Sequence, residues 1–278
     1  MELLPKMKIA NICISHKHSP ILNDSKYFHI QVGSTLSKLD LGIHRDNTGN
    51  NISEKNPTYS ELTGLYWFWK NHAKDYDIIG LNHYRRFFLN DDENKLTDED
   101  VLHYLSTYDV ILPSKKYYPV SITQQYEIMH YKHDFDILKM ILDEKYPEYD
   151  YLKIWDNSNY GYLYNMFFMK YDDFVKAMHF IFSILDEVEK RVDISEYSPQ
   201  QQRIFGFMSE RLLSLYCQTN FKKIKELPIE FENVNHKVLI LGSNEFKAYL
   251  FKIVYRVQQP LSKITSKFLR EVLKSRSK

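Results

Sequence analysis

The chain has 278 residues, enough for one large domain or two small ones with a buried core. With 8 glycines and 9 prolines it is not collagen-like or linker-rich, and an aromatic content of 15% excludes a disordered polar chain. The net charge of +1 is unevenly distributed: residues 245–278 carry nine Lys and Arg against two Glu, a net +7, and residues 1–244 carry a net −6.

The two cysteines, Cys13 and Cys217, are too few for a disulfide framework or a four-cysteine zinc site, which favours a reducing compartment. No apolar run in the sequence approaches the roughly 18 residues of a membrane-spanning helix. Lys6 and Lys8 interrupt the N-terminus too early for a secretory signal. We therefore expect a cytoplasmic protein, soluble or attached to the inner face of the plasma membrane.

Apolar runs predict strands in the first half, and capping residues predict the helices between them. The expected strands cover 9–15, 28–33, 76–82 and 108–113; a polar loop covers 46–51. A nearly all-round apolar helix is expected over 61–73 with Ser60 as its N-cap, and Thr97 is expected to cap a short helix. Strands alternating with helices are typical of parallel α/β crossovers.

The second half is expected to be mostly helical. Helices are predicted over 124–145, 172–192 and 201–219 from their apolar periodicity. The charge balance changes near Asn244, so we predict one α/β domain over 1–244 and a separate basic tail over 245–278.

Cationic clusters follow three of the predicted strands. They are His16-Lys17-His18, His83-Tyr84-Arg85-Arg86 and Lys115-Lys116. Ligands of open α/β sheets bind outside the carboxyl ends of the strands, and arginine binds phosphate oxygens in a bidentate manner. The clusters therefore predict a site for a phosphorylated or diphosphate ligand; the alternative is that they are ordinary surface charges.

The known phosphate-loop and metal motifs are missing from the sequence. Neither the P-loop pattern nor G-x-G-x-x-G occurs, which removes the main support for kinases and dinucleotide enzymes. D-x-D spacing occurs at Asp98/Asp100, which helix capping explains, and at Asp134/Asp136, where residues two apart on a helix point to different faces. A divalent metal is not expected from either pair.

Two further polar pairs are candidates for acid–base chemistry. His130 and Asp134 stand four residues apart in the predicted 124–145 helix, so they are expected to meet on one face. Glu210 and Arg211 lie on the predicted 201–219 helix. For both pairs the alternative is a surface or core-rim polar contact.

The tail over 245–278 is basic and amphipathic. An apolar stripe runs beside its lysines and arginines, which suits an anionic membrane surface. A packed C-terminal helix with a solvated basic face is the alternative.

The stretches ELTGLYWFWKN at 61–71 and IGLNHYRRFF at 79–88 form a specific combination. They resemble a bacterial family of capsular and exopolysaccharide glycosyltransferases, long catalogued only as a domain of unknown function. Further matching stretches are His16-Lys17, 31–33, 46–53, His130 with Asp134, 165–167 and 203–212. The resemblance covers about residues 8–230, so the tail lies outside it.

The resemblance implies a GT-A-like fold: a Rossmann-type mixed α/β sheet flanked by helices, with a helical C-terminal part. It also implies a nucleotide-sugar-dependent hexosyltransferase, since some members are assigned as galactofuranosyl- or other hexosyltransferases acting on lipid-linked repeat units. Residues 83–86 stand where many GT-A enzymes keep a metal-binding D-x-D. This departure puts metal dependence in doubt, so we expect no cofactor and regard a divalent metal as an alternative that is not favoured.

A mechanism follows as a hypothesis, with a UDP-sugar as donor and a polyprenyl-diphosphate-linked oligosaccharide as acceptor. His83, Arg85 and Arg86 would offset charge on the leaving diphosphate, and Asp134 or Glu210 would deprotonate the acceptor hydroxyl. The expected substrate contacts are His16, Lys17, Asp46, Asn51, Glu61, Thr63, Tyr84, His130, Asn165, Arg203 and Arg211.

Two other classes of protein fit parts of the sequence. A non-enzymatic binder of nucleic acid or another anionic surface would use the basic tail and the aromatic segments. The −6 charge of residues 1–244 argues against nucleic acid as a partner, since backbone binding needs a basic domain face. A phospho-sugar transferase would share the cationic clusters but form phosphodiester products.

Overall fold

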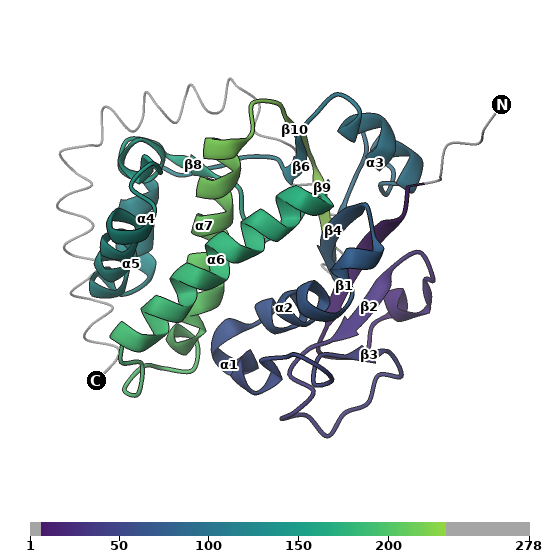
Figure 1. Ribbon diagram of the computed structural model, residues 1–278, viewed down its shortest axis with the longest axis horizontal. Helices are drawn as coiled ribbons and strands as arrows, with labels where there is room; N and C mark the ends of the chain where they lie inside the picture. Colours follow the sequence, from purple (N-terminus) through teal and green to yellow (C-terminus); the bar gives the residue numbers. More distant parts are fainter. Residues whose placement is uncertain (1–6, 232–278) are drawn as a thin grey trace.

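The structure, a computed structural model, describes residues 7–231. Its centre is a nine-stranded mixed sheet in which β10, β6, β9, β4, β1, β2 and β3 follow one another, with β5 and β11 attached beside β4 (Figure 1). The strands are β1 Ile9–Ser15, β2 Phe28–Gln31, β3 His44–Arg45, β4 Ile78–His83, β5 Arg86–Phe88, β6 Val110–Pro113, β9 Phe167–Lys170, β10 Ile224–Leu227 and β11 Ile229–Phe231. A separate pair joins β7 Lys116–Tyr117 to β8 Tyr160–Gly161.

The strand directions bring the predicted strand ends to one edge. Strand β1 pairs in parallel with β2 and β4, and β9 runs antiparallel between β4 and β6. Strands β4 and β6 therefore point the same way on either side of β9. As a result, the carboxyl ends of β1, β4 and β6 all lie at the same edge of the sheet.

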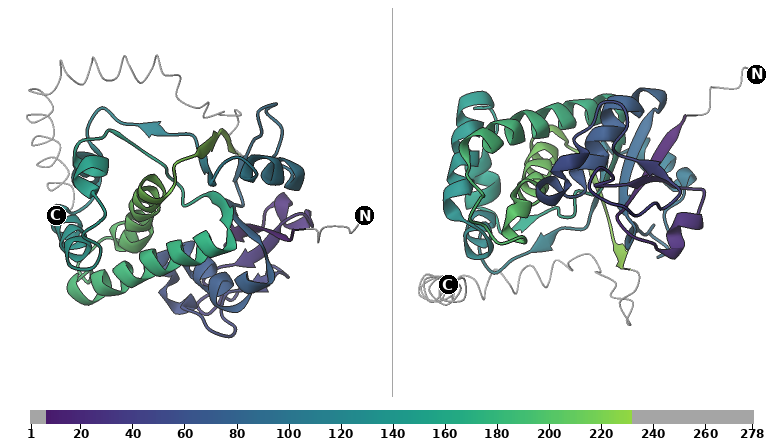
Figure 2. Two further views of the ribbon diagram at one scale, coloured as in Figure 1. Left: turned by 45° about the horizontal axis from the view of Figure 1, so that its top comes forward. Right: turned by 90° about the horizontal axis from the view of Figure 1, so that it is seen from below.

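Helices cover both faces of this sheet. They are α1 Asn56–Tyr59, α2 Leu62–Asn71, α3 Asp98–Leu105, α4 Ile122–Met129, α5 Lys132–Lys145, α6 Tyr171–Arg191 and α7 Ile204–Asn220. Neighbouring residues of β4 face opposite cores: Ile78 packs with Tyr104 of α3, and Ile79 belongs to the larger core that α2, α6 and α7 cover. Figure 2 shows the helices of the second half gathered beside the sheet.

Helix α2 lies unusually close to the sheet. A Cβ atom on Gly64 would lie 2.6 Å from Cγ1 of Val32, so a side chain at this position would push the helix away. The close approach brings the first turn of α2, and Glu61 before it, next to the carboxyl end of β1.

The fold predicted from the sequence is confirmed: a mixed α/β sheet flanked by helices. The predicted strands correspond to β1, β2, β4 and β6, and the 172–192 helix is α6. Thr97 caps α3 as expected, with Asp100 completing a capping box. The expectation for Ser60 is wrong: it turns the chain between α1 and α2 with a φ of +53°, and its side chain caps neither helix.

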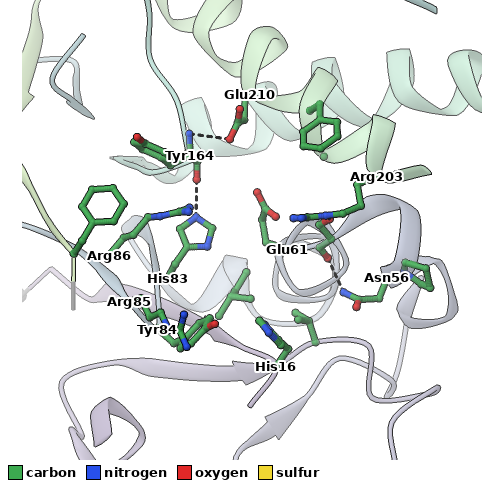
Figure 3. A pocket seen from close by; sticks show the side chains of 17 residues that line it. His16, Asn56, Glu61, His83, Tyr84, Arg85, Arg86, Tyr164, Arg203 and Glu210 are labelled. Carbon is green, nitrogen blue, oxygen red and sulfur yellow. Dashed lines mark hydrogen bonds between the residues drawn. The ribbon is translucent and has the colours of Figure 1, made fainter. Parts of the chain in front are cut away.

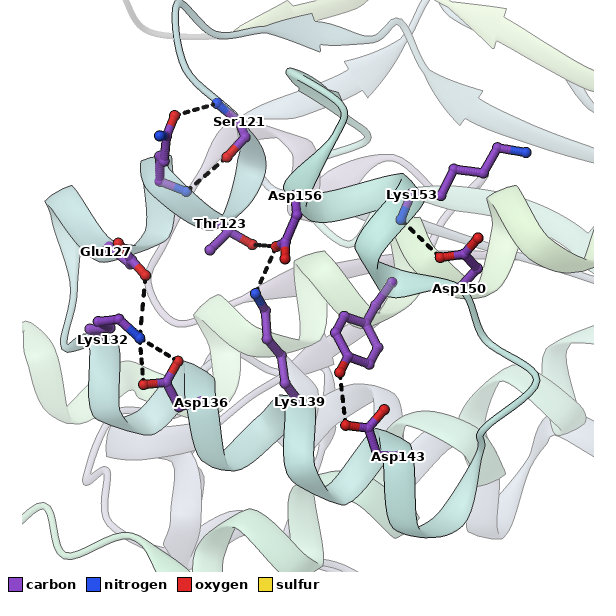
Figure 4. A network of polar contacts seen from close by, with 12 residues as sticks. Ser121, Thr123, Glu127, Lys132, Asp136, Lys139, Asp143, Asp150, Lys153 and Asp156 are labelled. Atoms are coloured by element: carbon purple, nitrogen blue, oxygen red, sulfur yellow. Dashed lines mark hydrogen bonds and ion pairs between the residues drawn. The ribbon is translucent and has the colours of Figure 1, made fainter. Parts of the chain in front are cut away.

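The predicted helix over 124–145 is also wrong, because the chain breaks into α4 and α5 at His130 and Tyr131. Polar contacts hold the two helices at this break (Figure 4). The Lys132 ammonium group lies 3.6 Å from Glu127 of α4 and 2.6 Å from Asp136 of α5. The apolar periodicity runs through 124–145 without interruption, so the sequence does not indicate the break between α4 and α5.

Within residues 7–231, no helix is long and apolar enough to cross a membrane. The predicted tail, residues 245–278, and its boundary near Asn244 lie outside the described residues.

Candidate functional site

A cavity of about 720 Å³ opens at the carboxyl ends of β1 and β4 (Figure 3). This volume is typical of a site for a small organic ligand. Eight predicted site residues line it: His16, Glu61, His83, Tyr84, Arg85, Arg86, Arg203 and Glu210. The other lining residues are Ile14, Val32, Asn56, Pro57, Ser60, Tyr164, Gly206, Phe207 and Phe231.

The cationic wall of the cavity is a tight hairpin between β4 and β5. His83 pairs with Arg86 across it, so Tyr84 and Arg85 form its two-residue turn. The Arg85 guanidinium packs over the ring of Tyr84 at 4.9 Å, and that of Arg86 lies 4.6 Å from the ring of Tyr164. Neither guanidinium forms an ion pair within residues 7–231. Both charges are therefore available to an anionic ligand.

The two histidines of the cavity both have pKa values lowered by burial. His83 Nε2 donates to the backbone carbonyl of Tyr164 at 2.6 Å. Burial lowers the pKa of His83, and Arg86 adds to this effect against the opposing charge of Glu61. Burial and the charges of Lys17 and Arg85 also lower the pKa of His16. The lowered pKa of His83 disfavours its cationic form, so Arg85 and Arg86 are the stronger candidates for the charge of this wall, and the predicted role of His83 stays a prediction.

Two carboxylates face the arginines from other elements. Glu210 of α7 accepts hydrogen bonds from the Tyr164 backbone N–H at 3.2 Å and from Arg211 Nη1 at 3.0 Å. Burial raises the pKa of Glu210, with Arg211 opposing the shift and Glu61 adding to it. Glu61 Oε1 accepts from Asn165 Nδ2 at 2.8 Å.

Backbone strain gathers at this cavity. Ser60, Tyr164 and Asn165 have φ values of +53°, +74° and +53°, in the left-handed region that non-glycine residues avoid. Each such residue costs on the order of 1–3 kcal/mol, and persists only where its surroundings enforce it. Here the bonds from Tyr164 to His83 and Glu210, and from Asn165 to Glu61, enforce the conformation. Strain held in this way favours a functional role for the cavity.

The two predicted arginines near α7 differ in their surroundings. Arg203 is exposed, lines the cavity, and donates from Nε to Ser60 Oγ at 3.0 Å. Arg211 is 6% exposed and donates to Phe207 O, Glu210 Oε2 and Gln125 Oε1. Arg211 therefore supports Glu210 from behind and is not part of the lining of this cavity.

Asp46 and Thr63 are predicted substrate contacts that the structure places in the interior. Both are fully buried. The Asp46 carboxylate accepts from the N–H groups of Gly33 and Ser34 and from the hydroxyls of Ser53 and Thr63. These four donors satisfy the Asp46 carboxylate. The bond between Asp46 and Thr63 joins the 46–51 loop to α2, and neither side chain faces the cavity.

Asn51 and Asn165 also lie outside the lining. Asn51 accepts from Ser53 N–H and donates to Gly49 O within its own loop. Asn165 is 2% exposed and donates to both Glu61 and Ser209, so it supports the site from one layer behind.

The expected pairing of His130 with Asp134 is wrong, because the helix breaks between them. His130 Nδ1 bonds to Gln201 Oε1 at 2.9 Å, with its ring stacked on Phe207. Asp134 is 1% exposed and accepts from the Tyr197 hydroxyl at 2.9 Å. Neither residue lines the cavity, so Glu210 is the predicted base that this cavity contains.

The lysines of the predicted cationic clusters do not line the cavity. Lys17 lies beside Tyr84 at 5.7 Å from its ring but is not part of the lining. Lys115 forms an ion pair with Glu226 at 2.8 Å, and Lys116 is in β7. Neither lysine lines the cavity, so the third cluster lies outside it.

Sequence reasoning missed Tyr164, whose backbone joins His83 to Glu210, and Phe231, which lies 5.5 Å from the Arg86 guanidinium. No sequence signal marks Phe231. For Tyr164 the neighbouring Asn165 is a weak signal, since asparagine tolerates a positive φ better than most residues. Within the described part of the chain, no group of three or more His, Cys, Asp or Glu side chains is placed to hold a metal ion.

The comparisons with known proteins give a family and a similar solved structure. A family model described as "Domain of unknown function (DUF4422)" matches residues 10–221. The chain belongs to this family. A search of curated proteins finds no match for this DUF4422 member.

Among solved structures, this DUF4422 chain is similar to the apo structure of the bifunctional glycosyltransferase WbbM, with 29% sequence identity and a TM-score of 0.73. The match covers 82% of this chain and 46% of WbbM, so the chain spans about half of that protein's length. The resemblance read from the sequence, to a glycosyltransferase-like family once catalogued as a domain of unknown function, is confirmed.

Proposed function

We propose that this DUF4422 protein is a glycosyltransferase that moves a hexose from a UDP-sugar to a hydroxyl of a lipid-linked oligosaccharide. One observation carries the proposal: guanidinium groups without an ion-pair partner among residues 7–231 share a cavity with two carboxylates at the strand ends of a WbbM-like fold. Such a cavity suits a ligand with a diphosphate at one end and hydroxyls at the other.

In the proposed reaction, Arg85 and Arg86 bind the diphosphate of the donor. Their planar guanidinium groups can contact two phosphate oxygens at once, and the rings of Tyr84 and Tyr164 hold them in place. As the bond to the anomeric carbon breaks, negative charge grows on the diphosphate. Fixed cations at this position stabilise that charge, and we propose that they do so without a divalent metal.

The finer features of the substrates extend this proposal. The hexose is galactose or galactofuranose by the family resemblance, and the acceptor is a polyprenyl-diphosphate-linked oligosaccharide of capsule or exopolysaccharide synthesis. The net +7 charge of residues 245–278 supports attachment to the inner, anionic membrane surface where such acceptors lie.

Substitution of the hairpin arginines tests the function. Purified Arg85→Ala and Arg86→Ala proteins are supplied with radiolabelled UDP-galactose or UDP-galactofuranose and membranes that contain the acceptor lipids. We expect each to lower the transfer rate about 10²–10³-fold, because a fixed stabiliser of the leaving group is lost. Arg191→Ala is the matched control, since Arg191 forms an ion pair with Glu144 on the surface at 2.7 Å.

Near-normal transfer by both hairpin variants would remove these arginines from the leaving-group role. The same assay with EDTA tests the metal: we expect unchanged transfer. A strong loss that manganese restores contradicts the metal-independent reaction. If neither donor yields product and UDP does not bind, the glycosyltransferase proposal itself is wrong.

A further inference from the structure

The two carboxylates of the cavity differ in what occupies their oxygen atoms. Glu210 accepts on both: Oε1 from the Tyr164 backbone N–H and Oε2 from Arg211. Glu61 accepts on Oε1 alone, from Asn165, and its Oε2 forms no hydrogen bond within residues 7–231. Figure 3 shows the Glu61 side chain extending into the cavity between His83 and Arg203. Among the described residues, this carboxylate oxygen therefore has no hydrogen-bond partner in the cavity.

The position of Glu61 is fixed from behind. Asn165 donates from the same Nδ2 to Glu61 Oε1 and to Ser209 Oγ, each at 2.8 Å. Asn165 is itself buried in a left-handed conformation, and the glycine contact of α2 with the sheet sets where Glu61 enters the cavity. A group held by buried partners in this way keeps its geometry without reorganisation during a reaction.

Glu61 and the hairpin arginines come from different walls of the cavity. Arg85 and Arg86 belong to the β4–β5 turn, and Glu61 precedes α2. Figure 3 shows Glu61 on the other side of His83 from Arg86. A carboxylate on a different wall from the diphosphate site suits proton removal from an acceptor hydroxyl that attacks opposite the leaving group.

We propose that Glu61 is the catalytic base of the transfer and that Asn165 positions it, an inference that rests on the proposed function. The acceptor oxygen forms a bond to the anomeric carbon while the bond from that carbon to the diphosphate breaks. The electron pair of the broken bond leaves with UDP, and the hydroxyl proton passes to Glu61 Oε2. This direct displacement inverts the anomeric configuration. Glu210, which already accepts one hydrogen bond on each oxygen, holds Tyr164 in place.

The test compares Glu61→Gln with Glu210→Gln and a matched control. Glu54→Gln serves as the control, because Glu54 is exposed and outside the cavity. UDP affinity is measured by calorimetry, and transfer is measured with the two UDP-hexoses and acceptor membranes. We expect Glu61→Gln to bind UDP within about threefold of the unmodified protein and to transfer about 10²–10⁴-fold more slowly. Glu54→Gln is expected to match the unmodified protein.

Three results would overturn the base assignment while leaving the proposed function intact. They are near-normal transfer by Glu61→Gln, a greater loss in Glu210→Gln than in Glu61→Gln, and a product whose anomeric configuration is retained. An unmodified protein that neither binds UDP nor transfers either hexose overturns the proposed function instead.

Two more variants separate catalysis from folding. Glu61→Asp keeps the charge and withdraws it by one methylene, so we expect slower transfer at unchanged UDP affinity. An unchanged rate counts against Glu61. For Asn165→Ala, a positioning role predicts a lower kcat with little change in the donor KM. A change in stability alone, with kcat preserved, contradicts that role.

Discussion

At the scale of single residues, Asp46 shows that a structural carboxylate and a ligand-binding carboxylate can look the same in a sequence. It stands in a loop rich in turn residues, near a motif of the family. In the folded chain its carboxylate instead accepts from two backbone N–H groups and the hydroxyls of Ser53 and Thr63. A buried acceptor with four donors anchors the loop and has no capacity left for a substrate.

Substitution of Asp46 distinguishes these roles. Asp46→Ala leaves four buried donors without an acceptor, so we expect the free energy of unfolding to fall by about 3 kcal/mol or more. Urea denaturation measures the change. Asp40→Asn is the control, since Asp40 is exposed and its 3.8 Å contact with Arg45 contributes little. A stable Asp46→Ala protein with weakened UDP binding would restore the substrate role.

At the scale of elements, the break between α4 and α5 is the largest difference from the predicted helices. The stretch 124–145 contains no glycine or proline and keeps its apolar periodicity, so local propensity favours a single helix. Contacts with distant segments prevail: His130 stacks on Phe207, and Tyr131 stacks on Tyr197 at 4.1 Å. Such contacts form only after the chain has folded and leave no local signal.

The burial of His130 at the break between α4 and α5 predicts that the stability of the protein depends on pH. Burial lowers the pKa of His130 to about 4, with Gln201 opposing and Arg211 adding to the shift. The unfolded chain takes up this proton near its ordinary pKa of 6.5, so stability is lost as the pH falls from about 6.5 to about 4. We expect the melting temperature of His130→Phe to fall less over this range. Parallel pH profiles for the two proteins would contradict this cause.

Elements with strong local patterns were predictable, and those that depend on distant partners were not. The apolar runs of β1, β4 and β6 and the amphipathic α6 are visible in the sequence. The short β5 pairs with β4 and β11, and β9 is a four-residue strand that runs antiparallel to its neighbours. For the site, strand-end reasoning identified His16 and the hairpin, whereas Tyr164 depends on packing between segments far apart in the chain.

At the scale of the whole molecule, the division of charge predicts where the protein works. Each lysine or arginine near an anionic membrane contributes about 1 kcal/mol of attraction, so a net +7 tail exceeds the −6 charge spread over the other 244 residues. We expect the full chain to sediment with anionic vesicles and a chain truncated after Asn244 to remain in solution, with UDP binding preserved. Phosphatidylcholine vesicles are the uncharged control. Equal sedimentation of both chains would refute an anchoring role for the tail.

The direction of β1 has a practical consequence. The strand begins at Ile9 and ends beside His16 in the cavity wall, and seven residues of strand span about 23 Å. The chain also leaves its described part at Phe231, which is itself in that wall. A biosensor surface coupled ahead of residue 7 would therefore leave the cavity open to solution, whereas a fusion partner inserted directly after residue 231 would crowd its entrance.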